Sequence, residues 1–213
     1  ILNSLVELSQ YSTGLSSLSA PITEDFNEDC LKALERYSNL KQMNLFFHQF
    51  KSSASTFYSL SFPSSLQNLE LYISYVSSHH LIENNLDSFK QLSNLKSLKF
   101  TITIDPFFKK DQMNLVLNVC KPLIGLNDLY FEIRNFEPNV KEEIENVFEF
   151  SQFYNELREK ISELSSFSLM APNISFEILG DVSPIKNLKT LKIYGSNQLI
   201  GPKNIEKFLL AID

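Results

Sequence analysis

One spacing of apolar residues recurs six times along the chain. An apolar residue is followed by a second three positions later, and by two more at alternate positions, as in Leu95, Leu98, Phe100 and Ile102. The other copies begin at Leu40, Leu66, Leu126, Leu164 and Leu188, and the last of them ends on a glycine, Gly195. A pattern that returns at such intervals is typical of stacked structural repeats.

The last three apolar positions of each copy predict a short β-strand. Residues two positions apart lie on the same face of a strand, so each copy would bury one face. The second apolar position advances by 26, 29, 31, 38 and 24 residues through Met43, Leu69, Leu98, Leu129, Phe167 and Leu191. Tight hairpins do not span such intervals, so we predict parallel strands that are joined by crossovers.

The segments between the copies carry apolar residues at helical spacing. They predict helices over 23–38, 77–93, 108–125 and 138–164, and a closing helix over 202–211. The connector 138–164 is long enough for one extended helix or for two. The start of the chain is less regular: Leu2, Leu5 and Leu8 indicate a worn first repeat, and the serine-rich stretch 12–19 is predicted to be a loop.

Two segments resemble the leucine-rich repeat family, NLKSLKF at 94–100 and NLKTLKI at 187–193. The resemblance covers about residues 40 to 195, and the long connectors are similar to those of the intracellular, helix-bearing, ribonuclease-inhibitor-like subclass. It implies an α/β solenoid of about six to seven repeats, with parallel strands on the concave face and helices on the convex face. The chain would then be a single leucine-rich-repeat-like domain over 1–213. Residues 1–39 would form an N-terminal cap region with a helix, 40–195 the repeats and 196–213 a C-terminal capping helix.

The residues between the apolar strand positions would face away from the core, in two exposed columns. The first column is Asn44, Glu70, Lys99, Tyr130, Ser168 and Lys192, and the second is Phe46, Tyr72, Thr101, Glu132, Met170 and Tyr194. Aromatic residues and methionine are enriched in the cores of protein interfaces. We therefore predict a partner-binding surface that consists of Phe46, Glu70, Tyr72, Lys99, Tyr130, Glu132, Met170, Lys192 and Tyr194. Two alternatives stay open, because strands favour aromatic residues in any case and a shifted register would expose other side chains.

The composition of the chain limits the classes of partner that we expect it to bind. Of the 213 residues, 43% are apolar, and the net charge is −6. An acidic chain lacks the basic footprint that nucleic acid or an anionic membrane requires, so neither is an expected partner. No apolar run approaches the roughly 20 residues that span a bilayer. Two cysteines, Cys30 and Cys120, do not make a disulfide framework, which favours an intracellular, cytoplasmic location.

Catalytic, cofactor and metal signatures are missing from the sequence. There is no Gly-rich phosphate loop, no Gly-x-Ser-x-Gly elbow and no His-Glu-x-x-His motif. His79 and His80 have no further ligand at a metal-binding spacing, and His48 lies elsewhere in the chain. We therefore expect no enzyme activity, no cofactor and no metal site.

The sequence thus predicts a non-catalytic protein-interaction module or scaffold that binds a protein partner on its concave sheet. Two alternatives remain. The chain could be a structural subunit of a large multiprotein assembly, because irregular repeat lengths suit permanent neighbours. It could also be an accessory repeat region of a larger enzyme such as a kinase or ubiquitin ligase, since it begins at Ile1 rather than at a methionine.

Overall fold

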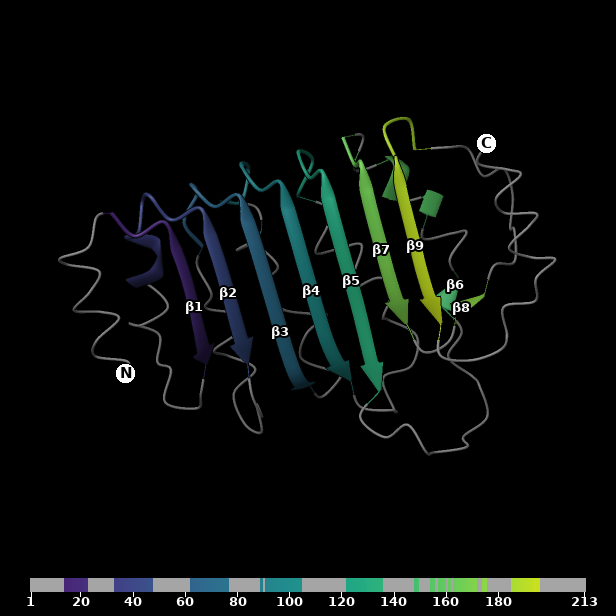
Figure 1. Ribbon diagram of the computed structural model, residues 1–213, viewed down its shortest axis with the longest axis horizontal. Helices are drawn as coiled ribbons and strands as arrows, with labels where there is room; N and C mark the ends of the chain where they lie inside the picture. Colours follow the sequence, from purple (N-terminus) through teal and green to yellow (C-terminus); the bar gives the residue numbers. More distant parts are fainter. Residues whose placement is uncertain are drawn as a thin grey trace.

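A seven-stranded parallel sheet dominates the structure, which is a computed structural model. It describes residues 14–22, 33–47, 62–76, 89, 91–104, 122–135, 148–149, 154–155, 157–159, 161, 163–171, 174–175 and 185–195. The strands lie side by side in the order β1-β2-β3-β4-β5-β7-β9 (Figure 1). Their bounds are β1 (Ser17–Ile22), β2 (Gln42–Phe47), β3 (Asn68–Val76), β4 (Ser97–Ile104), β5 (Asp128–Asn135), β7 (Ser166–Ala171) and β9 (Thr190–Gly195). The prediction of parallel strands is confirmed.

Over the positions of the apolar pattern, the strands of the main sheet pair in one register, and beyond Ile73 the pairing of β3 with β4 shifts. Leu69 pairs with Met43 on one side and with Leu98 on the other. The same position continues through Leu129, Phe167 and Leu191. A slip of one residue would turn each strand's apolar set to the opposite face, so the uniform register keeps the apolar side chains of neighbouring strands together.

The prediction of a loop at residues 12–19 is wrong for residues 17–19, because β1 begins at Ser17 and forms the first strand of the sheet. Its residues repeat the apolar spacing, with Leu15, Leu18, Ala20 and Ile22. Leu18 pairs with Met43, in register with the other copies. The pattern therefore occurs seven times, and serines between the apolar positions obscure the first copy.

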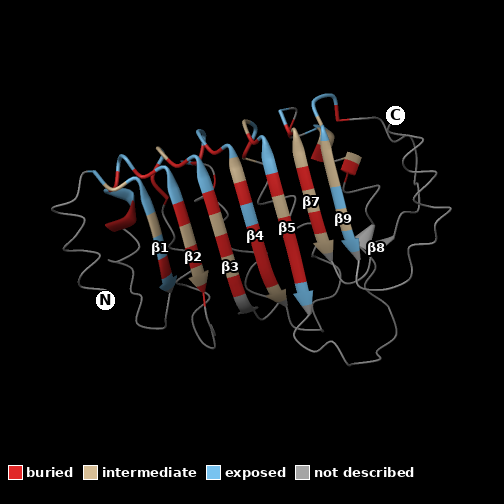
Figure 2. Ribbon diagram, in the orientation of Figure 1, coloured by how far each residue is buried: buried red, intermediate tan, exposed pale blue. Residues whose placement is uncertain are grey.

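One face of the sheet is buried along almost its whole width. Leu45, Leu71, Phe100, Phe131 and Leu169 each have no exposed surface. Figure 2 shows the buried positions alternating with more exposed ones along the strands. Within this row, the rings of Phe100 and Phe131 stack with centroids 5.0 Å apart. Full burial of a side chain of this size contributes about 1.5–3 kcal/mol, so this row is the main source of stability in the sheet.

A β-turn precedes each strand from β2 to β5 and also β7 and β9. Before β2, the N–H of Leu40 donates to the carbonyl of Tyr37, with N···O 3.0 Å. The equivalent bonds, 3.0–3.5 Å long, join Leu66 to Pro63, Leu95 to Leu92, Leu126 to Leu123, Leu164 to Ile161 and Leu188 to Ile185. Most of the residues that open these turns are buried and apolar. The repeated pattern therefore includes one more position, three residues before the first apolar residue of each of these copies.

A ladder of backbone hydrogen bonds links these turns across the sheet. The carbonyl of Lys41 accepts from the N–H groups of both Gln67 and Asn68, each at 2.9 Å. The carbonyls of Ser16, Gln67, Lys96, Asn127 and Ser165 accept two such bonds in the same way, at 2.8–3.1 Å. Each repeat thus uses the same carbonyl to hold the start of the next strand, which satisfies backbone groups where the sheet begins.

The predicted helices fall largely outside the described residues. Helical residues are described at 33–35, within the helix predicted over 23–38, and at 154–155 and 157–159, within that predicted over 138–164. Their side chains Leu34, Tyr154 and Leu157 are buried. Of the helix predicted over 108–125, residues 122–125 are described, and they belong to the turn before β5 rather than to a helix. Of that predicted over 77–93, residues 89 and 91–93 are described, just before β4. The helix predicted over 202–211 and the capping helix at 196–213 lie outside the described residues.

A second, smaller sheet corrects the prediction for 138–164. Strand β6 (Phe148–Glu149) pairs in parallel with β8 (Ile174–Ser175). A single extended helix therefore does not fill this connector, because Phe148 and Glu149 are in strand conformation. The apolar spacing there resembles that of a helix on both sides of this short strand, which explains the error.

Replacing Leu98 tests the register. Leu98 is 1% exposed on β4, so Leu98→Ala should lower the free energy of unfolding by about 2–5 kcal/mol, through lost burial and a cavity. The neighbouring Lys99 lies on the opposite face, and Lys99→Ala should cost at most about 1 kcal/mol. Urea denaturation of both variants measures the difference, and equal losses would contradict the register.

Candidate functional site

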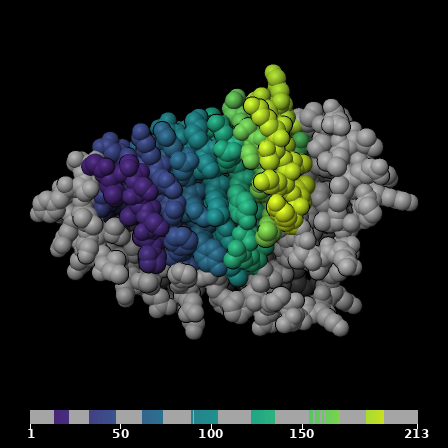
Figure 3. All heavy atoms as spheres, viewed as in Figure 1, coloured from purple at the N-terminus to yellow at the C-terminus, as the bar shows by residue number. Residues whose placement is uncertain are grey.

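The second face of the main sheet presents the residues that alternate with the core positions, and we call it the open face. In Figure 3, the strand atoms form a continuous band on this side, from β1 in purple to β9 in yellow. Asn44, Glu70, Lys99 and Tyr130 are register partners in the first predicted column, and Ser168 and Lys192 continue it. The two columns predicted from the sequence are therefore confirmed as rows across the sheet.

The predicted site residues differ in how far they are exposed. Lys99, Lys192 and Tyr194 are exposed, and Tyr194 retains 49% of its surface. The partly exposed ones are Phe46, Glu70, Tyr72, Tyr130 and Met170. Glu132 is only 5% exposed, and its neighbour Thr101 is 3% exposed. The expectation that Glu132 and Thr101 are exposed is therefore wrong.

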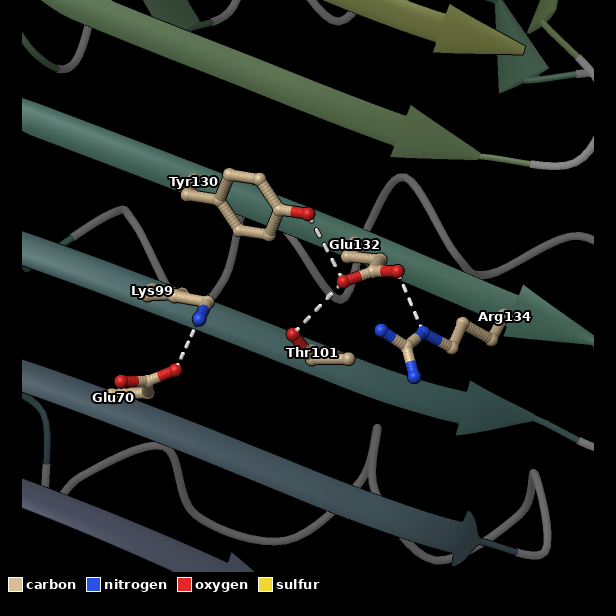
Figure 4. Close-up of polar contacts among 6 residues, drawn as sticks. All are labelled: Glu70, Lys99, Thr101, Tyr130, Glu132 and Arg134. Carbon is tan, nitrogen blue, oxygen red and sulfur yellow. Dashed lines mark hydrogen bonds and ion pairs between the residues drawn. The ribbon is translucent and has the colours of Figure 1, made fainter.

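Glu132 is buried because three side chains converge on its carboxylate (Figure 4). Arg134 Nε donates to Glu132 Oε1 at 2.6 Å. Tyr130 Oη donates to Glu132 Oε2 at 3.0 Å, and Thr101 Oγ1 donates to the same oxygen at 3.3 Å. A buried carboxylate is costly unless it is paired and hydrogen-bonded, and here both oxygens are satisfied.

The environment of Glu132 keeps it ionised. Burial is the largest influence and by itself raises the pKa of Glu132, but the hydrogen bonds from Arg134 and Tyr130 and the attraction of the Arg134 charge together outweigh it, so the pKa is lowered. The pKa of Tyr130 is raised by burial first, and then by its hydrogen bond to Glu132. At neutral pH, Tyr130 therefore stays protonated and donates to an ionised carboxylate.

Aromatic and charged side chains extend this cluster across strands β2 to β5. The guanidinium of Arg134 lies over the ring of Tyr72, with its central carbon 5.7 Å from the centroid. Tyr72 in turn lies beside Phe46, with centroids 6.5 Å apart. Such cation–π and ring pairs contribute about 0.5–1.5 kcal/mol each. These contacts hold Arg134, Tyr72 and Phe46 against one another on the open face.

A second branch of the cluster begins at Tyr130. Lys99 Nζ lies 5.7 Å from the centroid of the Tyr130 ring and also forms an ion pair with Glu70. We call the whole group the β2–β5 cluster, and it consists of Phe46, Glu70, Tyr72, Lys99, Thr101, Tyr130, Glu132 and Arg134. Of the predicted site residues, Met170, Lys192 and Tyr194 lie outside it, on β7 and β9.

Arg134 is the functional candidate that the sequence pattern missed. It lies two residues after Glu132, so it faces the same side of β5, and it pairs with Thr103 of β4. The prediction ended each strand at its last apolar position, whereas β5 continues to Asn135. Extending the alternation by one step would have placed Arg134 on the open face.

The described residues hold no group of three or more histidine, cysteine, aspartate or glutamate side chains that could bind a metal ion. His48, His79, His80, Cys30 and Cys120 lie outside these residues. Within the same part of the chain, no helix has the length and apolarity needed to cross a membrane. What the open face offers chemically is aromatic surface, hydrogen-bonding groups and charges held in defined positions.

Comparison with known proteins adds no family assignment. No family model matches the chain, and no curated protein matches it. The function is therefore argued from the open face alone.

The pH dependence of stability tests the role of Glu132. Its pKa in the folded protein is lowered, so its contribution to stability is present above its unfolded pKa and is lost as the pH falls through the folded value. Glu132→Gln should lower the free energy of unfolding by about 1–3 kcal/mol at pH 7, because hydrogen bonds to a charged group are lost. The difference from wild type should shrink as the solution is acidified.

Urea denaturation of wild type and variant over a series of pH values measures this effect. Glu163→Gln is the matched control, because it removes the same charge from an exposed turn residue and should change stability by no more than about 0.5 kcal/mol. A Glu132→Gln deficit that stays constant from neutral to strongly acid pH would contradict the account.

Proposed function

We propose that this chain is a leucine-rich-repeat-like α/β solenoid that serves as a non-catalytic protein-interaction module. The support is the repetition of one structural unit: a β-turn, a doubly bonded carbonyl and a strand in fixed register. Each unit is too small to bury its own apolar face, so neighbours must stack. In this proposal the strands line the concave face, and the connecting segments lie on the convex face.

The partner of this module is a protein, and it binds on the open face. The observation that carries this proposal is the β2–β5 cluster, in which two tyrosines, a phenylalanine and two cations are held in place by one another. Rigid aromatic groups lose little conformational entropy on binding, and Tyr and Arg are enriched among residues that dominate binding energy. An acidic chain with a net charge of −6 does not suit nucleic acid.

The dimensions of the sheet suit a protein partner. Neighbouring strands lie about 4.8 Å apart, so seven strands span about 29 Å. An extended segment of about nine residues, at roughly 3.3 Å per residue, would cross this distance. Such a segment would pass over Phe46, Tyr72, Met170 and Tyr194, which share one row of the register. An intracellular, cytoplasmic protein of this kind would act as an adaptor or scaffold.

A second candidate function is that of a structural subunit in a large assembly. The β6–β8 pair favours it, because this small sheet joins β6, from the longest interval between repeats, to β8, from the interval that follows β7. A small extra sheet of this kind, at one end of the main sheet, would give a permanently bound subunit an additional contact surface. Purification of the chain only in a complex of fixed composition would favour this function over that of an adaptor.

The double substitution Tyr72→Ala and Tyr130→Ala tests the binding proposal. The tyrosines lie on β3 and β5, on either side of β4, and are partly exposed. Their loss should release a partner that binds the open face, with a drop in affinity of at least about 30-fold if each contributes about 1 kcal/mol or more. Affinity capture from an extract of the source cells, followed by quantitative mass spectrometry, measures retention of the partner.

Ile124→Ala is the control for this experiment. Ile124 is a large apolar residue with 70% of its surface exposed, and it lies in the turn before β5 rather than on the open face. Its replacement should leave capture unchanged. Circular dichroism and thermal unfolding should show that both variants are folded, and equal partner retention by wild type and the tyrosine variant would refute binding on the open face.

A further inference from the structure

We propose that Arg134 is the central contact residue of the open face, and that it binds a carboxylate of an acidic, extended segment of the partner protein. Glu132 holds Arg134 in place and does not itself contact the partner. This inference rests on the proposed function and goes beyond it, because it assigns a chemical class to the partner and separates the roles of two neighbouring residues.

The geometry of Arg134 leaves its binding groups available. The contact with Glu132 uses Nε, and the ring of Tyr72 lies against the guanidinium. In the close-up, Nε faces the Glu132 carboxylate, and one of the two terminal nitrogens points away from it (Figure 4). The side chain is 50% exposed. Because a guanidinium carries five N–H groups in a rigid fork, the terminal nitrogens can still donate two parallel hydrogen bonds to a carboxylate.

Glu132 acts as a positioning residue. Only 7% of its side chain is exposed, and its two oxygens already accept bonds from Arg134, Tyr130 and Thr101. A partner therefore finds no free surface on it. The same bonds limit the rotation of Arg134, so that less conformational entropy is lost when a carboxylate binds.

The distribution of charge on the open face favours an acidic partner. Lys99, Arg134 and Lys192 are exposed. The carboxylate of Glu132 is covered, and that of Glu70 is paired with Lys99. Asp128 is the exposed acidic residue of β5, but it begins the strand, six positions before Arg134 and so about 20 Å away at 3.3 Å per residue. Three of the four exposed charged side chains on the described part of the open face are therefore cations, although the whole chain is acidic.

The test uses random peptides of about nine residues, the length that crosses the sheet. Selection on the full chain should enrich peptides that contain Asp or Glu, and their affinity should be measured against counterparts in which these residues are Asn or Gln. Arg134→Gln should weaken binding of the acidic peptides by about 10- to 100-fold, which is the range for hydrogen bonds to charged groups. The neutral counterparts should bind wild type and Arg134→Gln alike.

Two further variants separate the roles of the residues. Glu132→Gln should reduce the preference for acidic over neutral peptides while the protein stays folded, an effect that a purely structural residue would not produce. Arg36→Gln is the matched control, because Arg36 is exposed next to a helical segment away from the sheet, and it should bind like wild type.

Each outcome decides the inference. Peptides that lose affinity with the Tyr72→Ala and Tyr130→Ala variant but show no acidic preference would overturn it and leave the proposed function standing. Displacement by inorganic phosphate without a preference for Asp or Glu would assign the site to a phosphate group and also overturn it. If the wild type selects no peptide, the inference is overturned, whereas the capture experiment still decides the proposed function.

Discussion

Burial of alternate apolar side chains in a single register is the constraint on which the rest of the structure depends. Each strand buries one face, and a slip of one residue would expose that face to water. The turn before the strand and the doubly bonded carbonyl hold the register where β2 to β5, β7 and β9 begin, as at Lys41 and Gln67. With the start of every strand defined in this way, the rows of side chains on both faces follow.

The open face results directly from this register. Because β4 and β5 pair residue by residue, Thr101 lies beside Glu132, and Lys99 lies beside Tyr130. A buried carboxylate at this point would destabilise the sheet if it were alone. With Arg134, Tyr130 and Thr101 as donors, it instead orders the side chains around it. The buried carboxylate of Glu132 is thereby the common partner of Arg134, Tyr130 and Thr101.

The sequence predicted the strands well because the signal repeats. Six copies of one spacing located β2, β3, β4, β5, β7 and β9, together with their parallel pairing. The prediction failed at β1, where serines lie between the apolar positions. It also failed at Phe148–Glu149, where a short strand lies within a segment whose apolar residues have helical spacing. The two columns of the candidate site were also predictable, since alternation along a strand is strict. Arg134 was missed because the length of β5 depends on its pairing with β4 and on no local signal.

The sequence by itself determined the repeat, the parallel sheet, the register and the identity of the residues on each face, because all of these follow from periodicity along the chain. Only the tertiary structure decided which of those residues are available to a partner. Whether a side chain is exposed, and whether its charge is paired, depends on contacts between strands that are about 30 residues apart in the sequence. The hydrogen bond from Thr101 to Glu132 is an example. The periodic pattern marks Glu132 as outward-facing, whereas side chains from β4 and β5 together cover it, and no spacing within one strand contains that information.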